Sequence, residues 1–215
     1  MKKIVLLLGG SFNPIHLSHI QILEKAYASL KASGAQVDEA WLLPAMQNPD
    51  KPSCGMASFS HRLNMCELQC RNQPWLKVCN FESTLQPPYH SFAVLSQLVK
   101  AYPSHQFIWM MGSDNLMSFN AWDYWEDILF MLPIVVMGRD CNATHMKKSQ
   151  TLKMYPHALQ HLSSSWDHSP NIRLIENDQS MGSATQVRHA IQQGQIPDLL
   201  SQPVLNYIQQ NQLYR

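Results

Sequence analysis

The most constraining feature of the sequence is an apolar run close to its beginning. Residues Ile4 to Leu8 read Ile-Val-Leu-Leu-Leu, and Gly9-Gly10 end the run. A strand that is apolar at every position is typical of a parallel sheet, because helices cover both of its faces. The run therefore predicts a buried parallel strand that ends in a glycine turn.

Strand-like and helix-like segments alternate along the rest of the chain. The spacing of apolar residues predicts helices at about 15–31, 58–71, 91–101, 122–131 and 183–194, with one more helix after them. Short apolar segments predict further strands at 39–43, 75–79, 106–111, 133–137 and 172–175. This alternation predicts an α/β fold with a doubly wound, mostly parallel sheet.

The length and composition favour one domain. With 215 residues and 45% hydrophobic content, the chain can bury a single sizeable core, so we expect one domain over residues 1–215. Residues 44–58 have no regular period and predict a long loop, which in compact domains is often functional. Residues 139–170 have the weakest pattern, and we expect an irregular or mobile segment there within the domain.

Charge and cysteine content exclude several classes of protein. A net charge of +1 with 14% charged residues gives no basic field for a nucleic-acid polymer. The five cysteines are odd in number and contain no Cys-x-x-Cys pair, which predicts reduced thiols in the cytoplasm. No stretch is long enough to cross a membrane, so no membrane partner is expected. The later histidines have mixed spacing without nearby carboxylates or thiolates, so we expect no metal held by protein side chains.

Two histidines follow the first strand at helical spacing. Asn13 is expected to cap a helix that begins at Pro14, where a proline has no hydrogen bond to lose. His16 and His19 then share one face of the first turns, beside amides whose partial positive charge favours anions. Such pairs also occur as ordinary surface or packing residues. The order of strand, glycine turn, cap and histidine pair favours a site for nucleotide phosphates.

A second segment late in the chain has matching chemistry. Ser183 and Gln186 form a capping box that starts a helix. Ser183 and Thr185 offer hydroxyl groups beside the helix start, and Arg188 offers a planar fork to a phosphate. By itself this segment also fits an ordinary capped surface helix. If both helix starts follow parallel strands, they meet at one edge of the sheet and together could hold a polyphosphate.

Three separated motifs resemble those of the nucleotidyltransferase superfamily with the His-x-Gly-His motif, and within it the bacterial nicotinate-nucleotide adenylyltransferase family. The matching segments are Gly9-Gly10-Ser11-Phe12-Asn13-Pro14-Ile15-His16, Gly112-Ser113-Asp114-Asn115-Leu116 and Gly182-Ser183-Ala184-Thr185-Gln186-Val187-Arg188. The resemblance runs nearly end to end and implies a Rossmann-like nucleotidyltransferase fold. Neither a P-loop nor a Gly-x-Gly-x-x-Gly signature occurs.

The resemblance implies transfer of the AMP moiety of ATP to nicotinate mononucleotide, which gives nicotinate adenine dinucleotide and pyrophosphate in NAD biosynthesis. Because the attacking phosphate is already an anion, positioning and charge neutralisation would supply the catalysis. Mg²⁺ would be bound mainly through the ATP phosphates. Alternatives are an adenylyltransferase for nicotinamide mononucleotide or another phosphate acceptor, a cytidylyltransferase, and a non-catalytic nucleotide-binding module. The oligomeric state stays open, a homo-oligomer included.

The same resemblance implies roles for individual residues. The catalytic residues would be His16, His19 and Arg188. ATP would be bound by Gly9, Gly10, Ser11, Phe12, His16, His19, Lys51, Asp114, Ser183, Thr185 and Arg188. The mononucleotide would be bound by Asn13, His90, Ser91, Trp122 and Arg139, with Trp122 stacking on the pyridine ring.

The sequence departs from the family pattern at three places. Ser18 stands where His-x-Gly-His has its glycine, and its side chain is expected to crowd an approaching adenine or ribose. His90-Ser91 replaces a Tyr-Thr pair, so an aromatic side chain beside the substrate pocket is exchanged for an imidazole. Asp140-Cys141 follows Arg139 in place of Pro-Gly.

Overall fold

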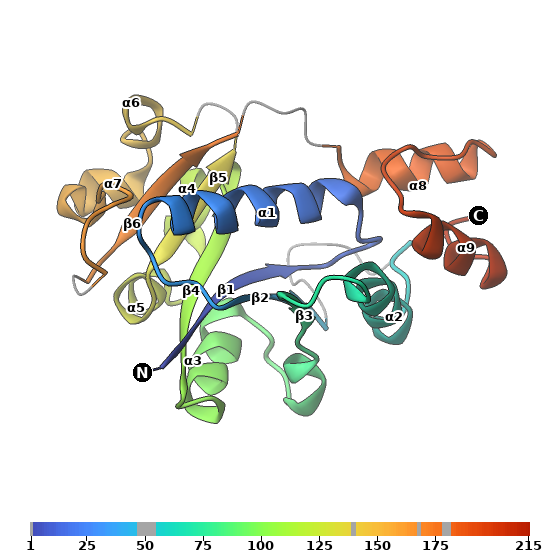
Figure 1. Cartoon of the computed structure of the whole chain (residues 1–215), viewed down its shortest axis with the longest axis horizontal. Coiled ribbons are helices and arrows are strands. Elements are labelled where there is room, and N and C mark those ends of the chain that lie inside the picture. Colours follow the sequence, from blue (N-terminus) through green and yellow to red (C-terminus); the bar gives the residue numbers. More distant parts are fainter. Residues whose placement is uncertain (1, 47–54, 139–140, 167–168, 178–181) are drawn as a thin grey trace. The chain divides into compact units, whose positions relative to one another are not determined.

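The computed structural model describes residues 2–46, 55–138, 141–166, 169–177 and 182–215. Six strands form one parallel sheet in the order β3-β2-β1-β4-β5-β6 (Figure 1). The strands are β1 (Lys3–Gly10), β2 (Glu39–Pro44), β3 (Leu76–Val78), β4 (His105–Gly112), β5 (Ile134–Gly138) and β6 (Ile172–Glu176). The predicted α/β fold with a doubly wound parallel sheet is therefore confirmed.

Helices separate the strands along the chain. The α-helices are α1 (Leu17–Ala32), α2 (Phe59–Cys70), α3 (Ser91–Ala101), α4 (Ser113–Ser118), α5 (Trp125–Met131), α6 (Ala143–Met146), α7 (Gln150–Met154), α8 (Ala184–Gln192) and α9 (Gln202–Gln210). The 3-10 helices are η1 (Phe81–Thr84), η2 (Phe119–Ala121) and η3 (Pro156–Ala158). No helix in the described part of the chain is both long and apolar enough to cross a membrane.

The internal contacts divide the chain into two compact units. Unit 1 contains residues 1–8, 22–40 and 90–179, and unit 2 contains residues 9–21, 41–89 and 180–215. Unit 1 holds β4, β5, β6 and helices α3 to α7, and unit 2 holds β3 and helices α2, α8 and α9.

The core of unit 1 is built from consecutive apolar strand residues. In β1, Val5, Leu6 and Leu7 are fully buried. β1 pairs with β4, β4 with β5 and β5 with β6, all in parallel, and Figure 1 shows β4 to β6 side by side. Because these strands are buried on both faces, nearly every residue is apolar rather than every second one.

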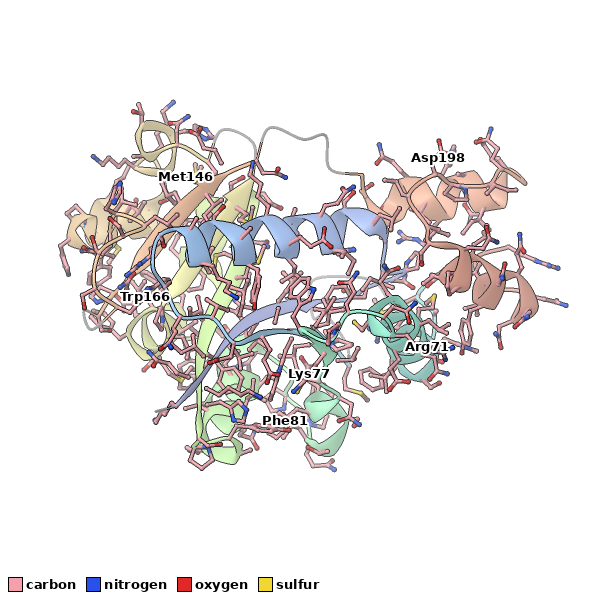
Figure 2. All side chains as sticks on the ribbon, in the orientation of Figure 1. Arg71, Lys77, Phe81, Met146, Trp166 and Asp198 are labelled. Atoms are coloured by element: carbon pink, nitrogen blue, oxygen red, sulfur yellow. The ribbon has the colours of Figure 1, made fainter. Side chains whose placement is uncertain are left out.

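A buried arginine organises the chain before β6 in unit 1. The Arg173 guanidinium donates to the carbonyl oxygens of Leu162, Ser164 and Ser165 at 2.6–2.9 Å. It also lies 3.3 Å from the centre of the Trp166 ring, which Figure 2 labels. Burial lowers the pKa of Arg173 to about 10, so the side chain stays charged at neutral pH.

Three short helices, α6, α7 and η3, lie between residues 143 and 158, although the sequence there shows no clear period. The Asn142 side chain accepts from the His145 backbone at the start of α6, and the Ser149 side chain accepts from Leu152 at the start of α7. Helices of four and five residues are too short to display a helical period, so their caps define them. The expectation of irregular structure is wrong for this part of residues 139–170.

Candidate active site

In unit 2 the loop after β1 places the Phe12 ring close to Gly10. Phe12 has a φ of 44°, in the left-handed region that bulky residues rarely adopt. A Cβ on Gly10 would lie 3.1 Å from the Phe12 ring, so a side chain at this position would crowd the ring. Gly9 and Gly10 are half-buried, and the hydroxyl oxygen of Ser11 is buried without a hydrogen-bond partner among the described residues.

The predicted helix start at Asn13-Pro14 is wrong. These two residues form a turn, and α1 begins at Leu17. The Asn13 side chain does not cap a helix, because its oxygen accepts from the Ala57 backbone at 3.0 Å and its amide group donates to the Gly55 carbonyl at 3.3 Å. Asn13 thus holds the loop to a segment more than 40 residues away in sequence, and sequence reasoning mistook this link for a cap.

The two histidines lie together at the start of α1. The ring centres of His16 and His19 are 3.8 Å apart, and the edge of Phe12 packs on His19 at 5.1 Å. Nδ1 of His19 accepts from the His16 backbone at 3.2 Å, which fixes the neutral His19 tautomer with its proton on Nε2. The His19 ring therefore presents an N–H donor on the side opposite this bond.

His16 is a buried neutral imidazole. Its side chain is 4% exposed, and burial lowers its pKa to about 4 because the charged form would lose its hydration. Nδ1 of His16 is buried and has no hydrogen-bond partner among the described residues. A buried polar atom without a partner costs free energy, which makes this nitrogen a candidate for contact with a ligand.

Three backbone amides at the start of α1 already have acceptors within the protein. The Leu17 amide donates to the Leu199 carbonyl, the His19 amide to the His16 carbonyl and the His16 amide to the His19 ring. These donors are therefore already used within the protein. The expectation that amides beside the two histidines favour an anion stays a prediction, and these three amides already have acceptors within the protein.

The start of α8 matches its prediction. The Ser183 hydroxyl accepts from the Gln186 backbone at 3.2 Å, and the Gln186 side chain accepts from the Ser183 backbone at 2.8 Å, so the capping box is confirmed. Arg188 donates to the hydroxyl oxygen of Thr185 at 3.2 Å. Ser183 and Thr185 are exposed and Arg188 is half-buried, so all three are accessible to solvent.

Contacts join the early and late segments within unit 2. The Arg188 guanidinium donates to the Asn13 carbonyl at 2.7 Å, and the Gly182 amide donates to the Ser18 hydroxyl at 3.2 Å. The expectation that these two segments lie together is confirmed. Ser18 is 3% exposed, and its oxygen links α1 to the residue before Ser183. The serine that replaces the family glycine thus has a structural partner in this chain.

A buried arginine, Arg62, holds the loop after β1 through hydrogen bonds to backbone carbonyls. It was not predicted from the sequence. Arg62 is 1% exposed and donates to the carbonyl oxygens of Ser11 at 2.7 Å, Met46 at 3.0 Å and Ala57 at 3.1 Å. The buried Glu82 accepts from the Met46 amide at 2.8 Å, and burial raises the pKa of Glu82 to about 7 although Arg62 favours its charged form. A signal existed, because Arg62 shares a helix face with the apolar Met65 and Cys66.

Unit 1 contains Asp114 and Trp122. Asp114 is exposed in the first turn of α4, and its carboxylate occupies the space that a side chain on Gly112 would need. Trp122 is half-buried, and its ring meets the buried Phe119 edge-on at 5.4 Å. The helix expected from Trp122 begins instead at Trp125, so Trp122 lies in extended backbone between η2 and α5.

His90 and Ser91 also lie in unit 1, at the start of α3. Nδ1 of His90 accepts from the Ala93 backbone at 3.3 Å, so this histidine is a helix cap. Tyr124, which is 58% exposed and has a φ of 56°, packs on His90 at 5.5 Å and on Phe92 at 5.2 Å. Tyr124 was not predicted as a site residue. It supplies an exposed aromatic ring beside His90, the imidazole that replaces the family tyrosine.

Two predicted site residues, Lys51 and Arg139, lie outside the described residues. Within the described ranges no group of three or more His, Cys, Asp or Glu side chains is arranged to hold a metal ion. The predicted residues that unit 2 brings together are donors: two imidazoles, hydroxyl groups and one guanidinium. Such a set can bind and neutralise phosphate oxygens, and it contains no activated side-chain nucleophile.

Comparison with known proteins agrees with this chemistry. The profile of the family described as cytidylyltransferase-like matches residues 7–190. A probable nicotinate-nucleotide adenylyltransferase of Shewanella pealeana is 33% identical over 214 residues, which are 97% of this chain and 94% of the relative. One of Parvibaculum lavamentivorans is 39% identical over 133 residues, 62% of this chain and 63% of the relative.

A solved structure shares the fold. The nicotinic acid mononucleotide adenylyltransferase of Plasmodium falciparum, complexed with NaAD, superposes with a TM-score of 0.71 at 19% identity, over 99% of this chain and 97% of its own. The family profile and the Shewanella pealeana relative match this chain by sequence, so they show the family without the likeness of fold. The chain therefore belongs to the cytidylyltransferase-like family and, within it, to the nicotinate-nucleotide adenylyltransferases.

Proposed function

We propose that this protein transfers the AMP moiety of ATP to nicotinate mononucleotide and releases pyrophosphate. The observation that carries the proposal is the His16–His19 pair: one ring has a buried nitrogen with no hydrogen-bond partner in the described part of the chain, and the other has a fixed tautomer. The names of the relatives supply the substrates. The mononucleotide phosphate attacks the α-phosphorus of ATP, the bond to the β-phosphate oxygen breaks, and a dinucleotide and pyrophosphate result.

The side chains of unit 2 would act on the triphosphate. Nε2–H of His19 would donate to an oxygen whose negative charge grows during attack, and the neutral His16 ring would meet a second phosphate oxygen. Arg188 has five N–H donors, and a guanidinium binds phosphate through two of them at once. Because the nucleophile is an anion, these groups need only hold the reactants and neutralise charge.

The side chains of unit 1 would act on the mononucleotide and the ribose. We assign pyridine stacking to Trp122, whose ring is held edge-on by Phe119, and contact with the nucleotide ribose region to Asp114. The donor set of unit 2 suits anions rather than cations, so we place Mg²⁺ on the ATP phosphates, where it would neutralise the leaving pyrophosphate. The four described cysteines are free thiols, which fits a cytoplasmic enzyme.

A pyrophosphate-release assay tests the proposal. The purified protein is supplied with ATP or CTP as donor, and with nicotinate or nicotinamide mononucleotide as acceptor. We expect fast release only with ATP and nicotinate mononucleotide, together with the dinucleotide in the product chromatogram. Pyrophosphate release with nicotinamide mononucleotide at an equal kcat/KM would refute nicotinate mononucleotide as the preferred acceptor. ATP binding without pyrophosphate release from any pair would refute the adenylyltransferase activity.

A further inference from the structure

The side chain of Tyr214 reaches the loop that carries the histidines. Its hydroxyl donates to the Asn13 side-chain oxygen at 2.8 Å, although the two residues are 201 positions apart. The same oxygen accepts from the Ala57 amide, so it must be the carbonyl oxygen of Asn13, and the phenol must be the donor. Burial raises the pKa of Tyr214 above its ordinary value, so this donor keeps its proton at neutral pH.

The Asn13 side chain makes three hydrogen bonds in this arrangement. Its oxygen takes two donors, and its amide group donates to the Gly55 carbonyl. An inverted amide would place its NH₂ group against the Ala57 N–H, so Ala57 and Gly55 set the orientation of the amide. The Tyr214 hydroxyl adds a second bond to the oxygen and so helps to hold Asn13, whose backbone carbonyl receives the Arg188 guanidinium.

The backbone around Tyr214 takes a costly path to make this contact. Gln212 has a φ of 52° and Tyr214 a φ of 65°, both in the left-handed region that non-glycine residues avoid. Such conformations persist when surrounding contacts determine them, and they gather at functional sites. Residues 212–215 also form one wall of a pocket of about 320 Å³ whose other lining includes Met56, Arg188 and Gln192.

We propose that Tyr214 is a positioning residue for the phosphate-binding loop. By holding Asn13, it keeps residues 11–16 and the Arg188 guanidinium in the geometry that binds the triphosphate. The proposal rests on the proposed adenylyl transfer. In this role Tyr214 acts through Asn13 and not through a bond of its own to the phosphates.

The test compares Tyr214→Phe with Tyr207→Phe. Each change removes one tyrosine hydroxyl from unit 2, but the Tyr207 hydroxyl bonds to His61 and Asn64, between α9 and α2. We expect Tyr214→Phe to lower kcat/KM for ATP about 5- to 30-fold, with KM for the mononucleotide within twofold of wild type. Tyr207→Phe is expected to leave both parameters within twofold. Equal losses in the two variants, or a wild-type kcat/KM for ATP in Tyr214→Phe, would overturn the proposal.

A double-mutant cycle tests the route through Asn13. In an Asn13→Ala background we expect Tyr214→Phe to have less than a twofold further effect, because the acceptor is already gone. Binding of inorganic tripolyphosphate, measured by calorimetry, gives a readout that requires no transfer. If the wild type fails to make dinucleotide but Tyr214→Phe still weakens tripolyphosphate binding, the proposed function fails and the positioning role stands. Full additivity in the cycle would overturn the role of Asn13.

Discussion

Replacing Arg62 with methionine should destabilise the protein more than any surface change. The guanidinium makes three hydrogen bonds of 2.7–3.1 Å to the carbonyl oxygens of Ser11, Met46 and Ala57, and its side chain is 1% exposed. Methionine fills similar volume but leaves three carbonyls without donors and Glu82 without its nearby cation. Breaking a buried charged network of this kind costs about 3–5 kcal/mol. For a chain of this length that corresponds to a fall in Tm of about 6–20 °C.

The free energy of unfolding lost in Arg62→Met should depend on pH, which gives a second check. The pKa of Glu82 is raised to about 7 by burial, and Arg62 acts against that rise. At pH 8, where Glu82 is largely ionised beside Arg62, removal of the cation should cost more than at pH 6, where the carboxyl group is largely protonated. Without Arg62 the pKa of Glu82 should rise further, so Glu82→Gln should recover part of the loss in the Arg62→Met background.

Urea unfolding followed by circular dichroism measures the effect at both pH values. Arg71→Met is the matched control, since Arg71 lies exposed at the end of the same helix (Figure 2). That control should change the free energy of unfolding by less than about 0.5 kcal/mol. If Arg62→Met unfolds at the same urea concentration as Arg71→Met, the assigned role of the buried guanidinium is refuted.

Three further changes test the site. His19→Ala should lower kcat about 10²- to 10³-fold through the loss of one preorganised donor, and should cost about 1 kcal/mol in urea unfolding because the His16 amide loses its acceptor; near-normal turnover would remove His19 from the mechanism. Ser18→Ala removes the acceptor of the Gly182 amide and should cost about 1 kcal/mol in urea unfolding, whereas an unchanged midpoint would show that this bond contributes nothing. For His16, the unfolded ring takes up a proton near pH 6.5 but the buried ring only near pH 4, so stability should fall between these values as pH falls. The fall should reach about 3 kcal/mol and should be missing in His16→Gln; equal pH profiles would contradict a buried neutral ring.

Local chemistry determined the parts of this protein that the sequence predicted well. The apolar run in β1 can only be buried on both faces, and Ser183 with Gln186 forms its capping box within one helical turn. Each of these features depends on neighbours a few residues away, so a single sequence is enough to recognise it. The chemical character of the side chains that we propose as phosphate donors is visible in the sequence for the same reason.

Only the tertiary structure decided how these parts are held. Asn13 looked like a helix cap, yet its partners include Ala57 and Tyr214. Ser18 meets Gly182 across 164 positions, and Arg62 meets the Ser11 carbonyl across 51. A polar side chain satisfies its hydrogen bonds with whichever group the fold brings near, and sequence spacing carries no record of that choice. The residue types of the site are therefore written in the sequence, whereas the contacts that fix their geometry arise when distant segments pack together.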